Sequence, residues 1–223
     1  MTDTSGSRIS IPQLILIPSL VTLGVTLLRL IGELQHWPTR LFNPEAGGQG
    51  SIIGIAWLAP IFGVYFALKL LRVGEDPPGA LRIIGFALGG LVVTILGGFV
   101  GFASKAEFPG KILIGLLLIG AGVVIPFLGW KPLGKVLLAY AYAARIPVVI
   151  LMYFAMRGNW HTHYDAIPPN PFPQDLPFWT KYFELAVVPQ MIMWIAFTMI
   201  TGMLLGGIAI AVASRRKTAA QLA

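Results

Sequence analysis

The three histidines of the chain lie in two short segments that also carry carboxylates. His161, His163 and Asp165 alternate along one stretch, and an extended backbone would point their side chains the same way. Glu33 and His36 stand three residues apart, a spacing that places both on one face of a helix. Two imidazoles and a carboxylate can hold zinc or iron. The pattern therefore supports two interpretations: a divalent-metal site that uses His36, His161, His163 and Asp165, or surface and capping roles.

Arg145 is the only charged residue in the apolar run 136–156. It lies roughly 15 Å from either end of that run at about 1.5 Å per residue. A guanidinium near the middle of a membrane costs at least about 2.5 kcal/mol, so it needs a partner. No carboxylate is expected at the same depth, and Pro147 frees a backbone carbonyl nearby. Arg145 is therefore either anchored to carbonyls, water or hydroxyls, or it binds an anionic ligand.

Polar side chains recur every three or four residues along the first apolar run. They are Ser19, Thr22, Thr26, Arg29, Glu33 and His36. This spacing puts them on one helical face, which should look toward protein or water because a polar stripe is costly against lipid. Gln190 belongs to a second, weaker stripe near the end of the chain. One interpretation is hydrogen-bonded packing, and the other is a ligand site formed by Thr26, Arg29, Glu33, Gln190 and Arg145.

Composition indicates what must position these residues. The 223-residue chain is 56% hydrophobic and 11% charged, whereas soluble domains carry roughly 25% charged residues. Apolar runs of the length that a bilayer core needs, about 20 residues, cover residues 11–34, 51–71, 82–104, 112–130, 135–156 and 185–213. They lack the alternation of barrel strands. The prediction is an all-α, polytopic transmembrane helix bundle of about six spanning helices. It forms one integral membrane domain over residues 1–223, with outer loops 35–50 and 157–184.

Basic residues set the orientation of this bundle. If the N-terminus is inside, nine Lys and Arg flank the helices on the inner side and five lie in the outer loops. The inner set is Arg8, Lys69, Arg72, Arg82, Lys131, Lys135, Arg215, Arg216 and Lys217, and the outer set is Arg40, Lys105, Lys111, Arg157 and Lys181. Lys and Arg accumulate on the cytoplasmic side. The count predicts both ends inside, in a bacterial-type cell inner (plasma) membrane.

Several classes of site and partner are excluded. The chain has no cysteine, which removes disulfides, thiolate metal sites, iron–sulfur clusters and c-type haem. No histidine lies in a predicted membrane core, so b-type haem lacks its usual ligands. The net charge of +7 comes mostly from the ends of apolar runs, which indicates contact with the lipid bilayer rather than nucleic acid. Apart from the divalent metal considered above, no cofactor is expected.

Three functional interpretations remain, because no sequence motif selects a reaction. The first is a non-catalytic accessory or scaffold membrane subunit that binds other membrane subunits or a second copy of itself. Glycines spaced by four, Gly85 and Gly89 and then Gly97 and Gly101, suit the close helix packing of such a protein. The second is a small transporter or binder of an anionic or amphipathic ligand that uses Arg145. The third is a membrane-embedded enzyme with an outer-face His/carboxylate site.

Overall fold

The computed structural model describes residues 10–48, 50–168, 173 and 175–222, without the side chains of residues 216–222, and within these residues the chain is helical and has no strand. Arg8 and the side chains of Arg216 and Lys217, which the orientation count used, lie outside the described part. The α-helices are α1 (Ile11–Leu34), α2 (Leu58–Arg72), α3 (Ala80–Gly98), α4 (Lys111–Gly129), α5 (Lys131–Gly158), α6 (Phe178–Tyr182) and α7 (Trp194–Leu222). A 3₁₀ turn, η1 (Ala46–Gly48), and three π-helical turns, η2 (Phe99–Ala103), η3 (Phe183–Val187) and η4 (Pro189–Met193), complete the described elements.

Five stretches are long and apolar enough to cross a membrane. They are Ile11–Leu34, Ala80–Ala103, Lys111–Gly129, Lys131–Gly158 and Phe178–Arg215. With the shorter α2, they form a bundle of about six helices, and the predicted all-α class is confirmed.

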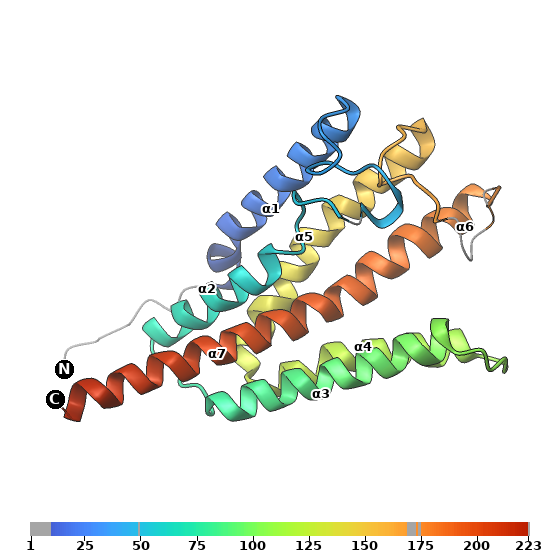
Figure 1. Ribbon diagram of the computed structural model, residues 1–223. Coiled ribbons are helices and arrows are strands. Elements are labelled where there is room, and N and C mark those ends of the chain that lie inside the picture. Colours follow the sequence, from blue (N-terminus) through green and yellow to red (C-terminus); the bar gives the residue numbers. More distant parts are fainter. Residues whose placement is uncertain (1–9, 49, 169–172, 174, 223) are drawn as a thin grey trace.

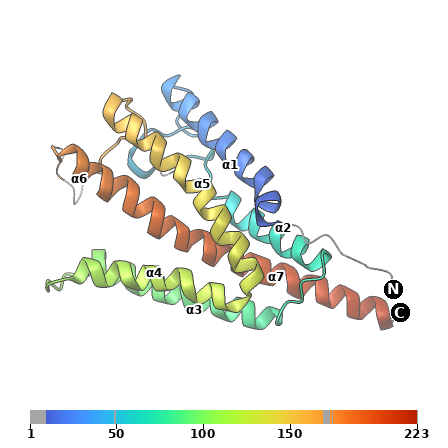
Figure 2. The ribbon, with the colours of Figure 1, turned by 180° about the vertical axis from the view of Figure 1, so that it is seen from behind.

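The helices alternate in direction, and α7 lies at the centre of the bundle (Figure 1). The α3–α4 hairpin packs on one side of α7, and α2 and α5 pack on the other, as the view from behind also shows (Figure 2). Among the described residues, α1 packs against α5 and α2 but not against α7. The segments 35–48, 50–57 and 159–168 lie together at one end, which we call the loop end.

The second helix begins later than predicted. The run 51–71 was expected to be helical throughout, but α2 starts at Leu58 and the residues before it form bends. The backbone amides of Ile52 and Ile53 donate to the carbonyls of Arg40 and Leu41 across the loop. Those bonds hold residues 51–57 over the loop end, and Pro60 then falls in the first turn of α2, where a missing N–H is tolerated.

The last membrane segment begins earlier than predicted. Residues 185–213 were expected, but helical backbone runs from Phe178, so the C-terminal part of the predicted outer loop 157–184 is helical. Pro177 stands at the N-cap position, outside the helix. Pro189 lies within the segment, and it falls at the start of the π turn η4. Neighbouring π geometry is one way in which a membrane helix absorbs a proline.

Glycine contacts close the α3–α4 hairpin, as the spacing of small residues predicts. A Cβ at Gly101 would lie 3.2 Å from Cα of Gly115, and one at Gly97 would lie 2.7 Å from the carbonyl oxygen of Gly115. Gly85, which the same spacing marked, is exposed and has no neighbour within 4 Å of its Cβ position. The side that contacts α4 is therefore set by Gly90 and Gly97 of α3 and by Gly101 of η2.

Candidate functional site

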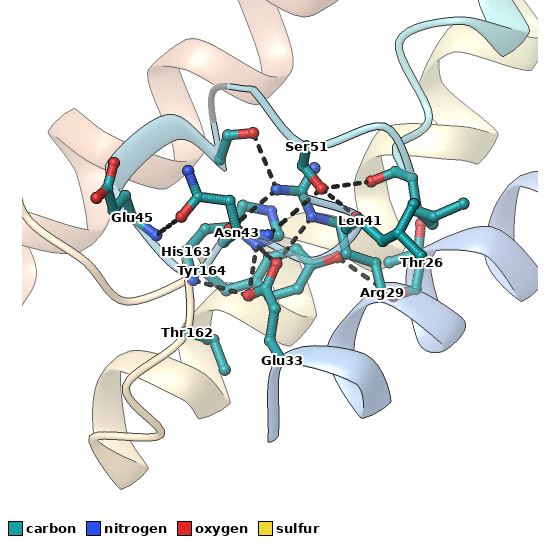
Figure 3. Close-up of polar contacts among 12 residues, drawn as sticks. Thr26, Arg29, Glu33, Leu41, Asn43, Glu45, Ser51, Thr162, His163 and Tyr164 are labelled. Carbon is teal, nitrogen blue, oxygen red and sulfur yellow. Dashed lines mark hydrogen bonds and ion pairs between the residues drawn. The ribbon is translucent and has the colours of Figure 1, made fainter. Parts of the chain in front are cut away.

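A buried carboxylate joins α1 to the loop that follows α5 (Figure 3). Glu33, in the last turn of α1, has a fully enclosed side chain. It accepts hydrogen bonds from Nε of Arg29 at 2.8 Å, from the backbone N–H of His163 at 2.9 Å and from Nδ1 of His163 at 2.6 Å. We call Arg29, Glu33 and His163 the loop-end network. It brings together segments 130 residues apart in the sequence.

The rest of the Arg29 guanidinium is held by the segment after α1. Nη2 donates to the carbonyl oxygens of Asn43 and Gly48 at 3.3 and 3.1 Å. Gly48 has a φ of +59°, and a Cβ there would overlap Nη2 of Arg29. Gly48 is therefore required twice, for its left-handed backbone and for the close approach of the cation. Arg29 has both a counter-charge and carbonyl acceptors, so its charge is fully compensated.

Asp165 shapes the loop that delivers His163. Its carboxylate accepts hydrogen bonds from the backbone amides of His161 and Thr162 and from the hydroxyl of Thr162, at 2.8 to 3.0 Å. Asn159 and His161 both have left-handed backbone, with φ of 48° and 58°. The segment is thus a tight turn, and the expectation of an extended strand with three side chains on one side is wrong.

The four residues of the predicted metal site do not come together. His36 was expected on the Glu33 face of the first helix, but α1 ends at Leu34 and His36 is exposed with a φ of 53°. Within the described residues, no group of three or more His, Asp or Glu side chains could hold a metal ion. His161 and Asp165 instead line an open pocket of about 370 Å³ beside Glu45 and Lys181. Of the predicted outer-face residues, Glu33 and His163 meet through their side chains, whereas Asp165 contacts His161 through its backbone N–H.

Below the loop-end network, tyrosines carry polar contacts into the bundle. The hydroxyl of Tyr164, buried at the loop end, donates to the carbonyl oxygen of Thr26 at 3.2 Å. One turn deeper, the hydroxyls of Thr22 and Tyr140 lie 2.8 Å apart, and that of Thr22 also donates to Pro18. The predicted stripe of α1 therefore faces protein, since Thr22, Thr26 and Glu33 are all buried.

Burial also affects the titration of the loop residues. It lowers the pKa of His163 below its ordinary value, although the hydrogen bond to Glu33 acts in the opposite direction. Neutral imidazole is therefore the form that the folded loop favours, with Nδ1–H donated to the carboxylate. Burial likewise raises the pKa of the Tyr164 phenol, so this hydroxyl stays a hydrogen-bond donor at neutral pH.

Arg145 lies in the middle of α5, near this column of polar groups but outside the loop-end network. It is 14 residues from Lys131 and 13 from Gly158 along the helix, about 20 Å from either end at about 1.5 Å per residue. Only 5% of the residue is exposed. In the described part of the chain, its one hydrogen bond runs from Nη1 to Oε1 of Gln190 at 3.1 Å. Its guanidinium carbon lies 4.3 Å from the ring centre of Trp194.

The π turns explain how α7 presents these partners. Gln190 lies inside η4 and Trp194 directly follows it. π-helical turns occur often at functional sites, because the extra residue re-aims side chains and disturbs the regular hydrogen-bond ladder. Pro189 starts η4 and has no N–H to donate. On the facing helix, Pro147 follows Arg145 by two residues. A π turn on one helix and a proline on the other therefore flank the guanidinium.

The five predicted ligand residues divide between two places. Arg29 and Glu33 belong to the loop-end network, and Thr26 supplies a carbonyl to Tyr164 beneath it. Arg145 and Gln190 form a separate pair deeper in the bundle. Sequence reasoning missed the contacts of Tyr164 and Tyr140. It placed Trp194 in the same weak stripe as Gln190, four residues after it and so on the same helical face, but did not include it among the ligand residues.

Comparisons with known proteins found no protein similar to this chain. A scan against protein-family models, a search of curated proteins and a search of solved structures each found no match. The function of the chain is therefore inferred from the geometry of these two sites.

Proposed function

We propose that the chain is a multi-pass integral protein of a bacterial-type inner (plasma) membrane, with both ends on the cytoplasmic side. Support comes from five helices long and apolar enough to cross a bilayer and from the alternating direction of the helices (Figure 1). The excess of Lys and Arg on the predicted inner side favours the same orientation. Under this proposal the loop end faces outward.

Within the membrane, the protein is a binding protein or small transporter for an anionic, amphipathic ligand, and Arg145 pairs with the ligand's charge. The observation that carries this proposal is the lack of an acidic partner. Among the described residues, no Asp or Glu forms an ion pair with Arg145. A guanidinium has five N–H donors, and one of them meets a neutral amide. A buried charge is costly unless it is paired.

Arg29 shows how the same chain satisfies a guanidinium that has a structural task. It lies on a buried carboxylate and two carbonyl oxygens at the loop end. Arg145 is more deeply buried and has neither kind of partner among the described residues. An amide and an indole face orient a guanidinium without neutralising it. The difference between these two arginines favours a counter-anion that the chain does not supply.

Native mass spectrometry of the purified protein in mild detergent tests this proposal. The wild-type protein should carry an acidic small molecule or lipid that Arg145→Gln has lost. Lys135→Gln, which removes an exposed cation from the same helix, should retain it. Identical adducts on wild-type and Arg145→Gln protein would show that Arg145 holds no ligand.

A second candidate is the accessory or scaffold subunit. It is favoured by the loop-end network, in which both carboxylate oxygens of Glu33 accept hydrogen bonds, from Arg29 on α1 and from the loop residue His163. Such a network builds a fixed surface and leaves no reactive group free. This candidate predicts that another membrane protein co-purifies in constant ratio after extraction in mild detergent. A lone, monodisperse chain that keeps its small-molecule adduct would favour the binding protein instead.

A further inference from the structure

The charge around Arg145 limits what its ligand can be. Apart from Arg145 and Arg29, the cations of α5 and of the loop end are exposed; they are Arg40, Lys131, Lys135 and Arg157. Arg29 is already neutralised by Glu33 at 2.8 Å. The interior therefore offers one uncompensated positive charge. A phosphate monoester carries about −1.5 to −2 at neutral pH, so it would leave negative charge buried and unpaired, which is costly.

The shape of the site limits the ligand further. The Arg145 guanidinium lies against Trp194 at 4.3 Å and is oriented by Gln190 at 3.1 Å. A carboxylate is planar and pairs with two parallel N–H groups of a guanidinium. Because Oε1 of Gln190 accepts from Arg145, the amide nitrogen of the same side chain is left as an additional donor. A phosphodiester lipid also has one charge, but its phosphorus is tetrahedral and substituted on two sides. Its headgroup is therefore larger than a carboxylate, beside a residue that is only 5% exposed.

The surroundings of the site indicate an apolar remainder. Arg145 lies about 20 Å from either end of α5 at about 1.5 Å per residue, far from the helix ends where water is expected. Exposed side chains close to Arg145 and Gln190 along the chain are apolar: Ile146 and Ile150 on α5 are 48% and 53% exposed, and Met193 on η4 is 40% exposed. Trp194 itself is half-buried. A chain attached to the bound anion would therefore continue along apolar side chains and lipid.

From these features we infer that the ligand of Arg145 is a monocarboxylate with a long apolar chain, of the fatty-acid type. This inference rests on the proposed function and adds the chemical class of the ligand. Arg145 binds the carboxylate through two N–H groups, Gln190 orients the guanidinium and donates to a carboxylate oxygen, and Trp194 covers the pair.

Competition binding with amphiphiles that differ only in the headgroup tests the class. The purified wild-type protein, in a neutral maltoside detergent, is titrated with dibrominated stearate, which quenches tryptophan fluorescence on contact. Hexadecanoate, hexadecyl phosphate, phosphatidylglycerol and hexadecanol then compete. Hexadecanoate should compete at least about tenfold better than the other three, the scale on which a charge-assisted bidentate pair discriminates.

Variants separate this inference from the proposed function. Arg145→Gln should lose the preference for hexadecanoate, and Lys135→Gln should keep it. If Arg145→Gln fails to accumulate, Arg145→Lys serves instead. It keeps the charge but loses the fork of donors, so hexadecanoate should bind about tenfold more weakly. Unchanged binding to Arg145→Lys would overturn the bidentate carboxylate.

The remaining outcomes are also decisive. If hexadecyl phosphate or phosphatidylglycerol competes as well as hexadecanoate, and does so only with Arg145 present, the carboxylate class is wrong while the anion-binding function stands. If no amphiphile shows binding that depends on Arg145, both are wrong.

Discussion

Replacing Glu33 with glutamine should destabilise the protein strongly, because it removes the only negative charge in the loop-end network. The carboxylate accepts three hydrogen bonds, one from Arg29 and two from His163. Glutamine has nearly the same shape, but its NH₂ group would face donors, and Arg29 would be left without a counter-charge. Breaking a buried ion pair from one side costs about 3–5 kcal/mol. Arg29 keeps two carbonyl acceptors and is 11% exposed in its side chain, so we expect the lower end of that range, about 3 kcal/mol.

Thermal unfolding of the purified protein in detergent, followed by tryptophan fluorescence, measures this loss. A loss of about 3 kcal/mol should lower the midpoint by roughly 6–12 °C for a chain of this size. Glu107→Gln is the matched control, because Glu107 pairs with Lys111 at 2.5 Å but its side chain is 79% exposed. An exposed pair contributes at most about 1 kcal/mol.

A second substitution tests the physical reason. If Glu33→Gln destabilises the protein because it leaves the charge of Arg29 unpaired, the double variant Arg29→Gln, Glu33→Gln should lose less free energy of unfolding than the sum of the two single losses. Equal unfolding midpoints for Glu33→Gln and Glu107→Gln would refute a stabilising role of the buried carboxylate. Strict additivity of the two losses would show that the guanidinium and the carboxylate do not act on each other.

Three further predictions concern the same loops and the helix contacts. The pKa of His163 in the folded protein lies below its unfolded value of about 6.5. The neutral imidazole therefore contributes its full share to the free energy of unfolding above that value, and this share is lost as the pH falls through the folded pKa. His163→Gln should flatten this loss in unfolding midpoints measured from about pH 8 to pH 5. Gly48→Ala should lower the midpoint more than Gly50→Ala: both have positive φ, but only a Cβ at Gly48 meets a neighbour, the guanidinium of the loop-end network. Equal losses would mean that backbone strain alone matters. In Gly63→Ala the new Cβ would overlap the backbone of α7. This variant should lose about 1–3 kcal/mol of the free energy of unfolding, seen as a lower midpoint in the same thermal unfolding assay. Gly85→Ala has open space around the new Cβ and should keep the wild-type midpoint.

Local signals account for part of the site. The spacing of Thr22, Thr26 and Glu33 predicted a polar face directed at protein or water, and all three are buried in protein. The rule behind that prediction needs only helix geometry and the cost of polar groups against lipid. The same rule failed for His36, because it assumed a helix that continues. α1 ends at Leu34, and the backbone of His36 is left-handed.

The all-helical class and the approximate positions of the long apolar segments follow from composition along the chain, because about 20 apolar residues in a row can satisfy their backbone in lipid only as a helix. Arg145 could be recognised in the same way, since one charge in an apolar run is visible without any structure. The folded chain was needed to show that His163, rather than His161 or His36, meets Glu33 across 130 residues, and that Arg145 faces Gln190 and Trp194 rather than a carboxylate. Such partners depend on turns and helix rotations that bring distant segments together, and no periodicity along the chain encodes them.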